Sequence, residues 1–287
     1  MKLNYQVPLS QGSLSFFLPK GQYGNIMIRI SGIAAAGVTI TRAQLGNCQL
    51  VWNGQQVINV DLELLNQLNN LYGGYSDFTS ALAGAFTASI IIPTGTYFDS
   101  SNIYEVGAND QVQLKIDFPD LANIANVASG NIAIYTKEKI GAMNYLYNMV
   151  PRFIVAGGAG NIADTYAVNN ISQVFLKKPL TDGLTSHIQI LKDNRTIADC
   201  DTVVAQDYSD YIHQVETPND VIAIEMSESK DVREAIGGQV SYQYQFTGAA
   251  TLKQYYGYIS FTPAKAVESR ARSAEKIAMN ISNVQAK

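Results

Sequence analysis

The sequence predicts an all-β fold made of two antiparallel, eight-stranded jelly rolls in one chain, with short helices in the loops and a helical C-terminal tail. The first observation behind this prediction is an internal repeat, because residues 49–72 align without gaps on residues 189–212 at an offset of 140. The second is the alternation of apolar and polar residues in short runs, which is the pattern of half-buried strands. The third is the recurrence of turn residues at intervals of about 8–12 residues, which is typical of sandwiches and jelly rolls.

A β-hairpin is the clearest element of the repeat. Asn53-Gly54 lies between the apolar runs Leu50-Val51-Trp52 and Val57-Ile58. An Asn-Gly pair adopts the positive φ angles of a type I′ turn at low cost, so it predicts a two-residue hairpin loop. The second copy carries Asp193-Asn194 at the same place, which is also turn chemistry. We therefore expect the same hairpin in both halves.

A short helix is expected after each hairpin. Asp61 and Asp201 are placed to cap these helices through their carboxylates. In the first copy, leucines recur at the spacing that lays an apolar stripe on a core. These leucines are Leu62, Leu65, Leu68 and Leu71.

Matching strands are expected in the rest of each half. The alternating segments 111–118 and 239–246 both follow a turn-forming stretch, and their offset of 128 indicates loop insertions in the first half. Early strands are expected at 14–18 and 25–31, and in the second half at 166–168 and 172–176. Middle strands are expected at 88–92 and 220–224, and final strands at 131–136 and 256–262.

Composition excludes several classes of protein. The chain has 287 residues and a formal net charge of −4, which argues against a general polyanion binder. It contains no run of 18 apolar residues, so we expect no membrane-spanning helix. Met1 to Pro8 lacks the apolar core of a secretory signal. Cys48 and Cys200 are expected as small core residues, since two thiols give no disulfide framework. We therefore expect synthesis in the cytosol.

Few residues are candidates for chemistry. His187 and His213 are the only histidines, and neither lies in a recognisable motif, so we expect structural or exposed roles. Calcium requires several oxygen ligands, and helix capping or solvent exposure competes with that interpretation of the densest acidic group. This group consists of Asp199, Asp201, Asp207 and Asp210. The sequence thus predicts no enzyme, no catalytic residue and no cofactor, with calcium the one ion left open.

A basic tail begins where the strand pattern stops at Pro263. Apolar residues recur there at helical spacing, as Val267, Ala271, Ala274, Ala278 and Ile281. The basic residues of the tail include Lys265, Arg270, Arg272 and Lys276. One interpretation is an arm that contacts an anionic membrane surface or a partner subunit. The other is a helix packed on its own domain, or a frayed end.

These patterns divide the chain into three parts. We expect a first jelly roll with a connecting segment at 1–150, a second jelly roll at 151–262, and the basic amphipathic tail at 263–287. Chains of this length are large enough for two domains of ordinary size.

Several segments resemble a known family in their order and spacing. They are Leu18 to Tyr23, the strand from Ile26 to Gly32, the hairpin around Asn53-Gly54, the helix after Asp61, the junction Pro151-Arg152-Phe153, and the closing region Val240 to Tyr258. They resemble the double jelly-roll major capsid proteins of tailless icosahedral viruses with an internal membrane, the lineage that contains the adenovirus hexon. Within that lineage they are similar to the small corticovirus-type coat protein of phages. The chain departs from this pattern in its Ala/Gly-rich segments, 81–88 and 156–159, and in its extended basic tail.

The resemblance implies a coat protein with no catalytic site, located in the capsid shell of the virion after synthesis in the host cytoplasm. It implies a homotrimer that looks six-sided, because each chain contributes two similar domains. Its partners would be neighbouring capsomers and minor or penton capsid proteins, with no sequence-specific nucleic-acid binding. The tail, through Lys265, Arg270, Arg272 and Lys276, would be the contact with the viral membrane surface.

Two other functions stay open at this level. A carbohydrate-binding or glycan-processing sandwich shares the jelly-roll architecture, and fold alone does not fix function. A viral spike or receptor-binding protein is the third interpretation. Assembly into trimers and shells would separate the capsid interpretation from both.

Overall fold

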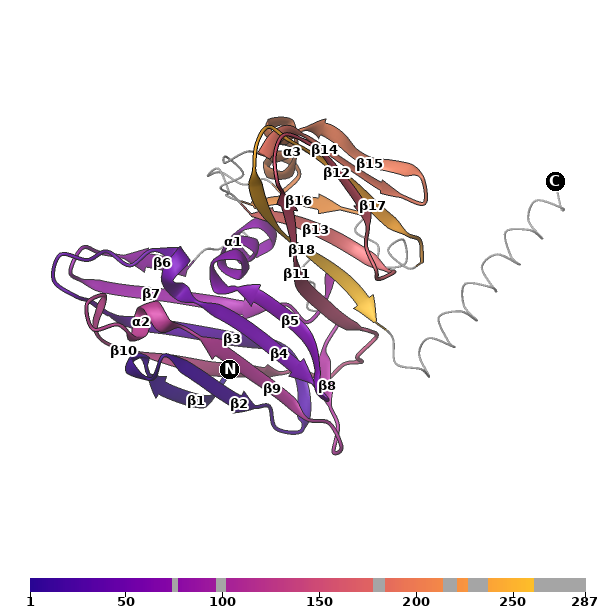
Figure 1. The fold of residues 1–287 in the computed structure, drawn as a ribbon. Coiled ribbons are helices and arrows are strands. Elements are labelled where there is room, and N and C mark those ends of the chain that lie inside the picture. The colour runs from indigo at the N-terminus through magenta and orange to yellow at the C-terminus, as the bar shows by residue number, and fades with distance from the viewer. Residues whose placement is uncertain (74–76, 97–101, 178–183, 214–220, 227–236, 261–287) are drawn as a thin grey trace.

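The structure is a computed structural model, and it describes residues 1–73, 77–96, 102–177, 184–213, 221–226 and 237–260. Two β-sandwiches form two lobes, and helix α1 lies between them (Figure 1). The predicted fold class, all-β with short helices in the loops, is confirmed. No helix in these described ranges is long and apolar enough to cross a membrane.

The first lobe contains the elements up to β10. Its strands are β1 (Lys2–Pro8), β2 (Ser13–Phe17), β3 (Gly21–Ala34), β4 (Asn47–Trp52), β5 (Gln55–Asp61), β6 (Asp77–Ser80), β7 (Ala85–Ile92), β8 (Tyr104–Val106), β9 (Val112–Asp117) and β10 (Val127–Glu138). Its helices are η1 (Leu9–Gln11), η2 (Arg42–Leu45), α1 (Leu62–Gly73) and α2 (Pro119–Ala122). One sheet has the order β1-β10-β3-β7-β6, with β8 paired to β3, and the facing strands have the order β5-β4-β9-β2.

The second lobe repeats this design with fewer additions. Its strands are β11 (Leu146–Ala156), β12 (Gly160–Thr165), β13 (Ile171–Lys177), β14 (Leu184–Lys192), β15 (Arg195–Asp201), β16 (Val221–Glu225), β17 (Val240–Phe246) and β18 (Ala250–Ser260). Its helix is α3 (Thr202–His213). The two layers have the orders β16-β13-β18-β11 and β12-β17-β14-β15.

The strand orders show that the repeat extends over both whole sandwiches. The order β1-β10-β3-β7 corresponds to β11-β18-β13-β16, and β2-β9-β4-β5 corresponds to β12-β17-β14-β15. Helices α1 and α3 follow equivalent strands and both contain 12 residues. Each eight-stranded set is a double-sheet jelly roll.

The repeated hairpin also has the expected geometry in both halves. The φ angles are 49° at Asn53 and 82° at Gly54. They are 50° at Asp193 and 64° at Asn194. Two consecutive positive φ angles define a type I′ turn, whose twist matches that of the flanking strands. The same turn is therefore made with Asn-Gly in one half and Asp-Asn in the other.

One predicted strand is wrong. The second strand of the second half is β12, Gly160–Thr165, whereas the sequence led us to expect it at 166–168. The residues of β12 are exposed or half-buried and carry no apolar alternation, so they give no strand signal. Tyr166, the first residue of the predicted strand, is buried although it does not belong to a strand. The centroid of its ring lies 5.0 Å from that of the Tyr242 ring.

The predicted domain boundaries can be compared with the structure at residues 150–151 and at the start of the tail. The border between residues 150 and 151 falls inside β11, which runs without interruption from Leu146 to Ala156. The tail, 263–287, and the last residues of the predicted final strand lie outside the described residues. The division into three parts stays a prediction.

The two lobes share a sheet and part of a core. Strand β5 pairs in parallel with β11 at Ile58 and Met149, which joins two four-stranded layers into one eight-stranded sheet. The hydrophobic cluster of the first lobe also includes residues of the second. These residues are Tyr147, Met149, Phe175, Val221, Ala223, Tyr255 and Ile259. Cys48 is buried in β4, Cys200 is half-buried in β15, and both are free thiols.

Candidate functional site

The candidate site is the contact between the two lobes, which we call the seam. On one side of it lie β5 and α1, and on the other lies the outer face of the layer β16-β13-β18-β11 (Figure 1). In that layer the side chains alternate between two cores. Val174 and Leu176 of β13 face the core of the second lobe, whereas Phe175 belongs to the cluster of the first. Strands β13 and β16 of this layer are therefore buried on both faces.

Each helix closes the edge of its own sandwich in the same way. Asn69 of α1 accepts a hydrogen bond from the backbone N–H of Ile91 in β7 at 2.6 Å, and donates one to the Ile91 carbonyl at 3.1 Å. Ser209 of α3 accepts a hydrogen bond from the backbone N–H of Ala223 in β16 at 3.1 Å. Asn69 and Ser209 are themselves related by the offset of 140. These bonds satisfy backbone groups next to the helix, which would otherwise be costly to bury.

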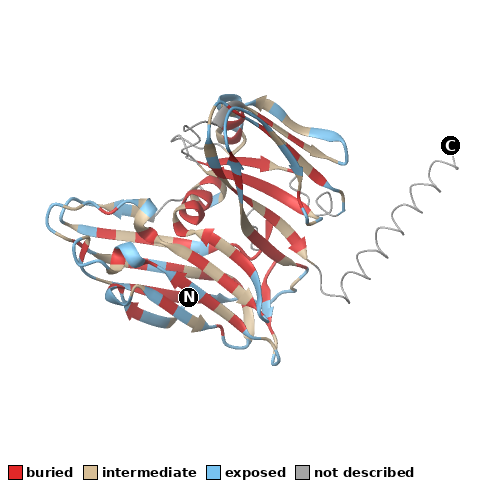
Figure 2. Cartoon of the chain, in the orientation of Figure 1, coloured by how far each residue is buried: buried red, intermediate tan, exposed pale blue. Residues whose placement is uncertain are grey.

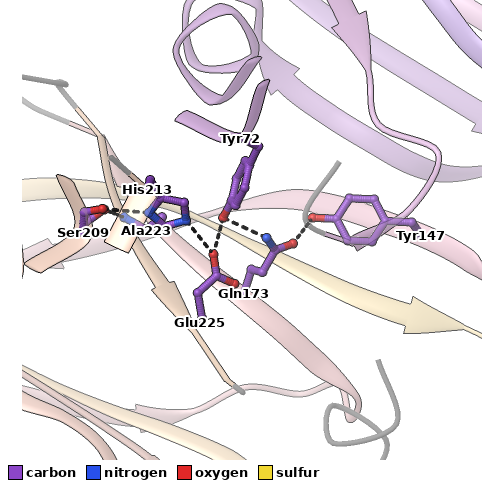
Figure 3. A network of polar contacts seen from close by, with 7 residues as sticks. All are labelled: Tyr72, Tyr147, Gln173, Ser209, His213, Ala223 and Glu225. Carbon is purple, nitrogen blue, oxygen red and sulfur yellow. Dashed lines mark hydrogen bonds and ion pairs between the residues drawn. The ribbon is translucent and has the colours of Figure 1, made fainter. Parts of the chain in front are cut away.

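A buried polar network crosses the seam (Figure 3). The Tyr72 hydroxyl at the end of α1 donates to Glu225 Oε1 at 2.6 Å and accepts from Gln173 Nε2 at 2.8 Å. Gln173 Oε1 accepts in turn from the Tyr147 hydroxyl at 2.9 Å. The His213 ring lies edge-on to the Tyr72 ring, with centroids 4.9 Å apart, and its Nε2 is 3.2 Å from Glu225 Oε1. The network thereby connects α1 to β11, β13, β16 and α3.

The network fixes the environment of the histidine. His213 Nδ1 lies 2.7 Å from the Ser209 carbonyl oxygen, so both ring nitrogens face oxygen acceptors. Each ring nitrogen that carries a proton can donate to the oxygen it faces. These contacts fix the position of the buried ring between α3 and β16.

A cluster of four charged side chains lies beside the network. Lys253 Nζ, from β18, is 2.8 Å and 2.9 Å from the two carboxylate oxygens of Asp61 at the end of β5. Lys177 Nζ, at the end of β13, lies 3.4 Å from Asp61 Oδ2 and forms an ion pair with Glu63 of α1. The two acids belong to the first lobe and the two lysines to the second. All four side chains are half-buried.

Two pKa values in this cluster, those of Asp61 and Lys177, move away from neutrality. Burial disfavours the carboxylate of Asp61, but the hydrogen bonds and charge of Lys253, with the charge of Lys177, outweigh it and leave the pKa of Asp61 below its ordinary value. Burial also disfavours the ammonium of Lys177, but Glu63, and then Asp61, raise the pKa of Lys177 above its ordinary value. Opposite charges at this range favour the charged forms of both partners, so the seam stays ion-paired around neutral pH.

Comparisons with known proteins can be set beside this geometry. No protein-family model matches the sequence, and no curated protein sequence matches it. The structure of the major capsid protein P2 from bacteriophage PM2 is similar with a TM-score of 0.60 and 16% identity, over 88% of this chain and 93% of that one. The atomic structure of Sulfolobus turreted icosahedral virus is similar with a TM-score of 0.65 and 11% identity, over 96% of both chains.

A third similar structure comes from the capsid of the virus PBCV-1. Its TM-score is 0.59 with 9% identity, over 86% of this chain and 89% of that one. This chain has the double jelly-roll fold. The resemblance stated from the sequence is therefore confirmed at the level of the fold, over most of the chain.

The structure gives Asp61 a partner that the sequence did not predict. We expected its carboxylate to cap the helix that follows, and the structure places both of its oxygens against Lys253 of the other jelly roll. Local spacing favours a cap, but a lysine 192 residues away offers a full positive charge. The equivalent Asp201 differs again, because its Oδ1 lies 3.7 Å from His187 Nδ1 on the exposed surface.

The other candidate residues of the second jelly roll lie mainly at its surface. His187 in β14 has Nε2 2.7 Å from Asp199 Oδ1, and both side chains are exposed. Hydrogen bonds from Gln189 and then from His187 lower the pKa of Asp199. Asp207 and Asp210 belong to α3, where Asp210 accepts a hydrogen bond from Gln206 at 2.9 Å. Among the residues that the structure describes, no group of three or more His, Cys, Asp or Glu side chains is arranged to hold a metal ion.

The tail residues proposed as a contact cannot be placed in this site. Lys265, Arg270, Arg272 and Lys276 lie outside the described residues. Two hollows lie in the part of the chain that the structure describes. The hollow between η1 and α2 is lined by no titratable side chain, and the hollow beside η2 is lined by a single carboxylate, that of Glu63. Neither hollow contains the pair of carboxylates that a glycosidase uses.

Sequence reasoning missed the seam. Lys177, Lys253, Tyr72 and Gln173 were not among the candidate residues, because each pairs with a group more than a hundred residues away. The alternation of β13 contains a usable signal. Gln173, Phe175 and Lys177 lie on one face of the strand, and the solvent-facing side of a half-exposed strand would not be expected to carry Phe175.

Proposed function

We propose that this chain is a structural major capsid protein, whose homotrimers tile an icosahedral shell around a membrane. The observation that carries the proposal is the presence of two complete jelly rolls of one design in a single chain, held together by a shared sheet. The similar solved structures come from virus capsids, which supports the same conclusion. The proposed location is the capsid shell of the virion, and the role is not enzymatic.

The two jelly rolls explain why three chains would suffice for a hexagonal outline. A symmetric threefold assembly of chains with two similar domains offers six similar edges to its neighbours. Such a particle fits the hexagonal lattice of a shell, although it contains only three chains. Neighbouring capsomers and minor or penton capsid proteins are the partners that this tiling requires.

The seam supports the proposal because a tile must be rigid. A change in the angle between the jelly rolls would break the hydrogen bonds between Tyr72, Gln173 and Glu225, and the ion pairs of Asp61. Each of these groups is buried or half-buried, so leaving one unpaired is costly. The two jelly rolls of one chain are therefore expected to move as a single body.

The division of the chain completes the proposal. Residues 1–150 supply the first jelly roll, residues 151–262 the second, and residues 263–287 a basic arm. Through Lys265, Arg270, Arg272 and Lys276, the arm would contact the anionic surface of the viral membrane.

Size-exclusion chromatography with light scattering tests the function. The purified chain is expected to elute at three times its own mass of 31.2 kDa. Vesicles with anionic lipid, compared with neutral vesicles, test the arm in the full chain and in a variant that ends at Pro263. A stable monomer that binds glycans would contradict the capsid role, and equal vesicle binding by both variants would contradict the membrane arm alone.

A further inference from the structure

Helices α1 and α3 occupy equivalent positions but are buried differently (Figure 2). On α1, Leu64, Leu68 and Leu71 are all buried. At the offset of 140 their equivalents on α3 are Val204, Tyr208 and Tyr211, which are 54%, 59% and 79% exposed. The three exposed side chains are spaced so that they share one face of the helix. The second jelly roll therefore carries, uncovered, the apolar face that the first jelly roll buries.

The surface that covers the α1 side of the seam is a row of residues on the second jelly roll. Register places Pro151, Tyr255, Phe175 and Ala223 side by side across β11, β18, β13 and β16. Phe175, Ala223 and Tyr255 belong to the cluster of the first jelly roll, together with the leucines of α1. The Tyr72 and Phe175 rings are in edge contact with centroids 6.4 Å apart.

The first jelly roll has the equivalent row on its own sheet. The bonds of Asn69 to Ile91 and of Ser209 to Ala223 set the equivalence, because the two helix residues differ by the same offset of 140. Starting from Ile91, register gives a row across β7, β3, β10 and β1. It consists of Ile91, Met27, Tyr135 and Leu3. Leu3 and Ile91 are exposed, and Met27 and Tyr135 are half-buried.

The charges follow the same equivalence. Two residues beyond Phe175 lies Lys177, which binds Asp61 across the seam. Two residues beyond Met27 lies Arg29, which is exposed, and the equivalent of Asp61 is Asp201, whose side chain is 62% exposed. The basic group on the sheet, Arg29, and the acidic group before the helix, Asp201, are thus present on surfaces that the other jelly roll of the same chain does not cover.

The other two charged positions of the cluster are both occupied by uncharged residues in the equivalent exposed surfaces. At the position equivalent to Lys253 the first sheet has Ala133, and at the position equivalent to Glu63 the second jelly roll has Val203. One positive and one negative charge are absent, so the two exposed surfaces still match in charge. Apolar side chains that face one another across these positions are favourable without any ion pair.

We propose that the α3 face of one chain packs on the outer face of β1-β10-β3-β7 of a second copy, as α1 packs on β11-β18-β13-β16 within the chain. In this contact Arg29 of one copy pairs with Asp201 of the next, and Tyr208 and Tyr211 cover the row from Leu3 to Ile91. The contact is head-to-tail, and repeating it about a threefold axis closes a ring of three chains. The inference rests on the proposed capsid function, because a ring of three chains is the assembly that it builds.

Charge reversal and charge exchange test the contact in the full chain. Arg29→Asp and Asp201→Arg each place like charges together, and Tyr208→Asp puts a charge into the apolar face. Sedimentation equilibrium over a dilution series should show the trimer dissociating at a protein concentration at least about tenfold higher than for the unmodified chain. The double variant Arg29→Asp with Asp201→Arg should restore assembly, since it recreates the pair with its polarity exchanged.

Matched controls are available on surfaces away from the contact. Lys115 in β9 and Asp120 in α2 are exposed, so Lys115→Asp and Asp120→Arg make the same changes of charge, and they are expected to leave assembly unaltered. A misfolded variant would not be rescued by a second reversal, so recovery in the double variant supports the contact and failure to recover contradicts it. Trimers that persist in all variants would overturn this contact while leaving the capsid function in place. An unmodified chain that is monomeric at every concentration would overturn both.

Discussion

The ammonium group of Lys253 lies 2.8 Å and 2.9 Å from the two carboxylate oxygens of Asp61, although 192 residues separate them. The pair links β18 of the second jelly roll to the end of β5 in the first. It therefore reports directly on whether the two jelly rolls are held together as one body.

A double-mutant cycle measures this pair. Lys253→Met and Asp61→Asn should each lower the free energy of unfolding by about 1–2 kcal/mol, between the values for exposed and buried pairs, because both groups are half-buried. The double variant should cost clearly less than the sum of the single variants. Urea unfolding gives all three values. Strict additivity would show that the two side chains do not interact.

Acidification should weaken the same contact. The pKa of Asp61 is lowered in the folded chain by Lys253 and Lys177, against the effect of burial. A lowered folded pKa contributes stability that is complete above the ordinary carboxyl pKa of about 3.9 and disappears as the pH falls through the folded value. The difference in stability between the unmodified chain and Asp61→Asn should therefore be constant near neutrality and shrink below about pH 4. A difference that grows on acidification would contradict the ion pair.

Tyr72→Phe tests the polar network. The change removes the hydroxyl that donates to Glu225 and accepts from Gln173, so it leaves buried polar atoms with fewer partners. The expected loss is about 1–3 kcal/mol of unfolding free energy, measured in urea. Tyr5→Phe is the matched control at an exposed tyrosine and should change stability by less than about 0.5 kcal/mol. Equal effects at the two positions would show that the network adds no stability.

The repeated hairpin turn can be tested by exchanging its chemistry. Asn194 has a φ of 64° at the position where the first copy has Gly54 with a φ of 82°. Asn194→Gly should stabilise the chain by about 0.5 kcal/mol, since glycine accepts positive φ without steric cost, and Gly54→Asn should destabilise it by a similar amount. Thermal unfolding of both variants measures the two shifts. Shifts of the same sign would contradict the equivalence of the turns.

The sequence predicts those parts of the fold that depend on local chemistry. Asn53-Gly54 specifies its turn through backbone preference, and the leucine spacing from Leu62 specifies the buried face of α1. Strand β12 escapes prediction because its exposed residues carry no alternation, and its place in the sheet comes from pairing with β17. Tertiary pairing, rather than intrinsic preference, defines such a strand.

The seam is not predictable from spacing for a different reason. Asp61 is a reasonable helix cap when only its neighbours in sequence are considered, and the competing partner, Lys253, becomes a neighbour only after both jelly rolls have formed. His213 follows the same logic, because its contacts with Tyr72 and Glu225 join three elements. What the sequence does contain is the repeat itself, and the repeat relates the seam within one chain to the contact that we propose between two chains.

Electron microscopy of the purified full-length chain tests the central claim most directly. The claim is that two equivalent jelly rolls in each chain build a threefold particle with six similar lobes. End-on class averages are expected to show a ring of six lobes with threefold symmetry and the mass of three chains. Particles with two lobes and the mass of one chain, at every concentration examined, would contradict the claim.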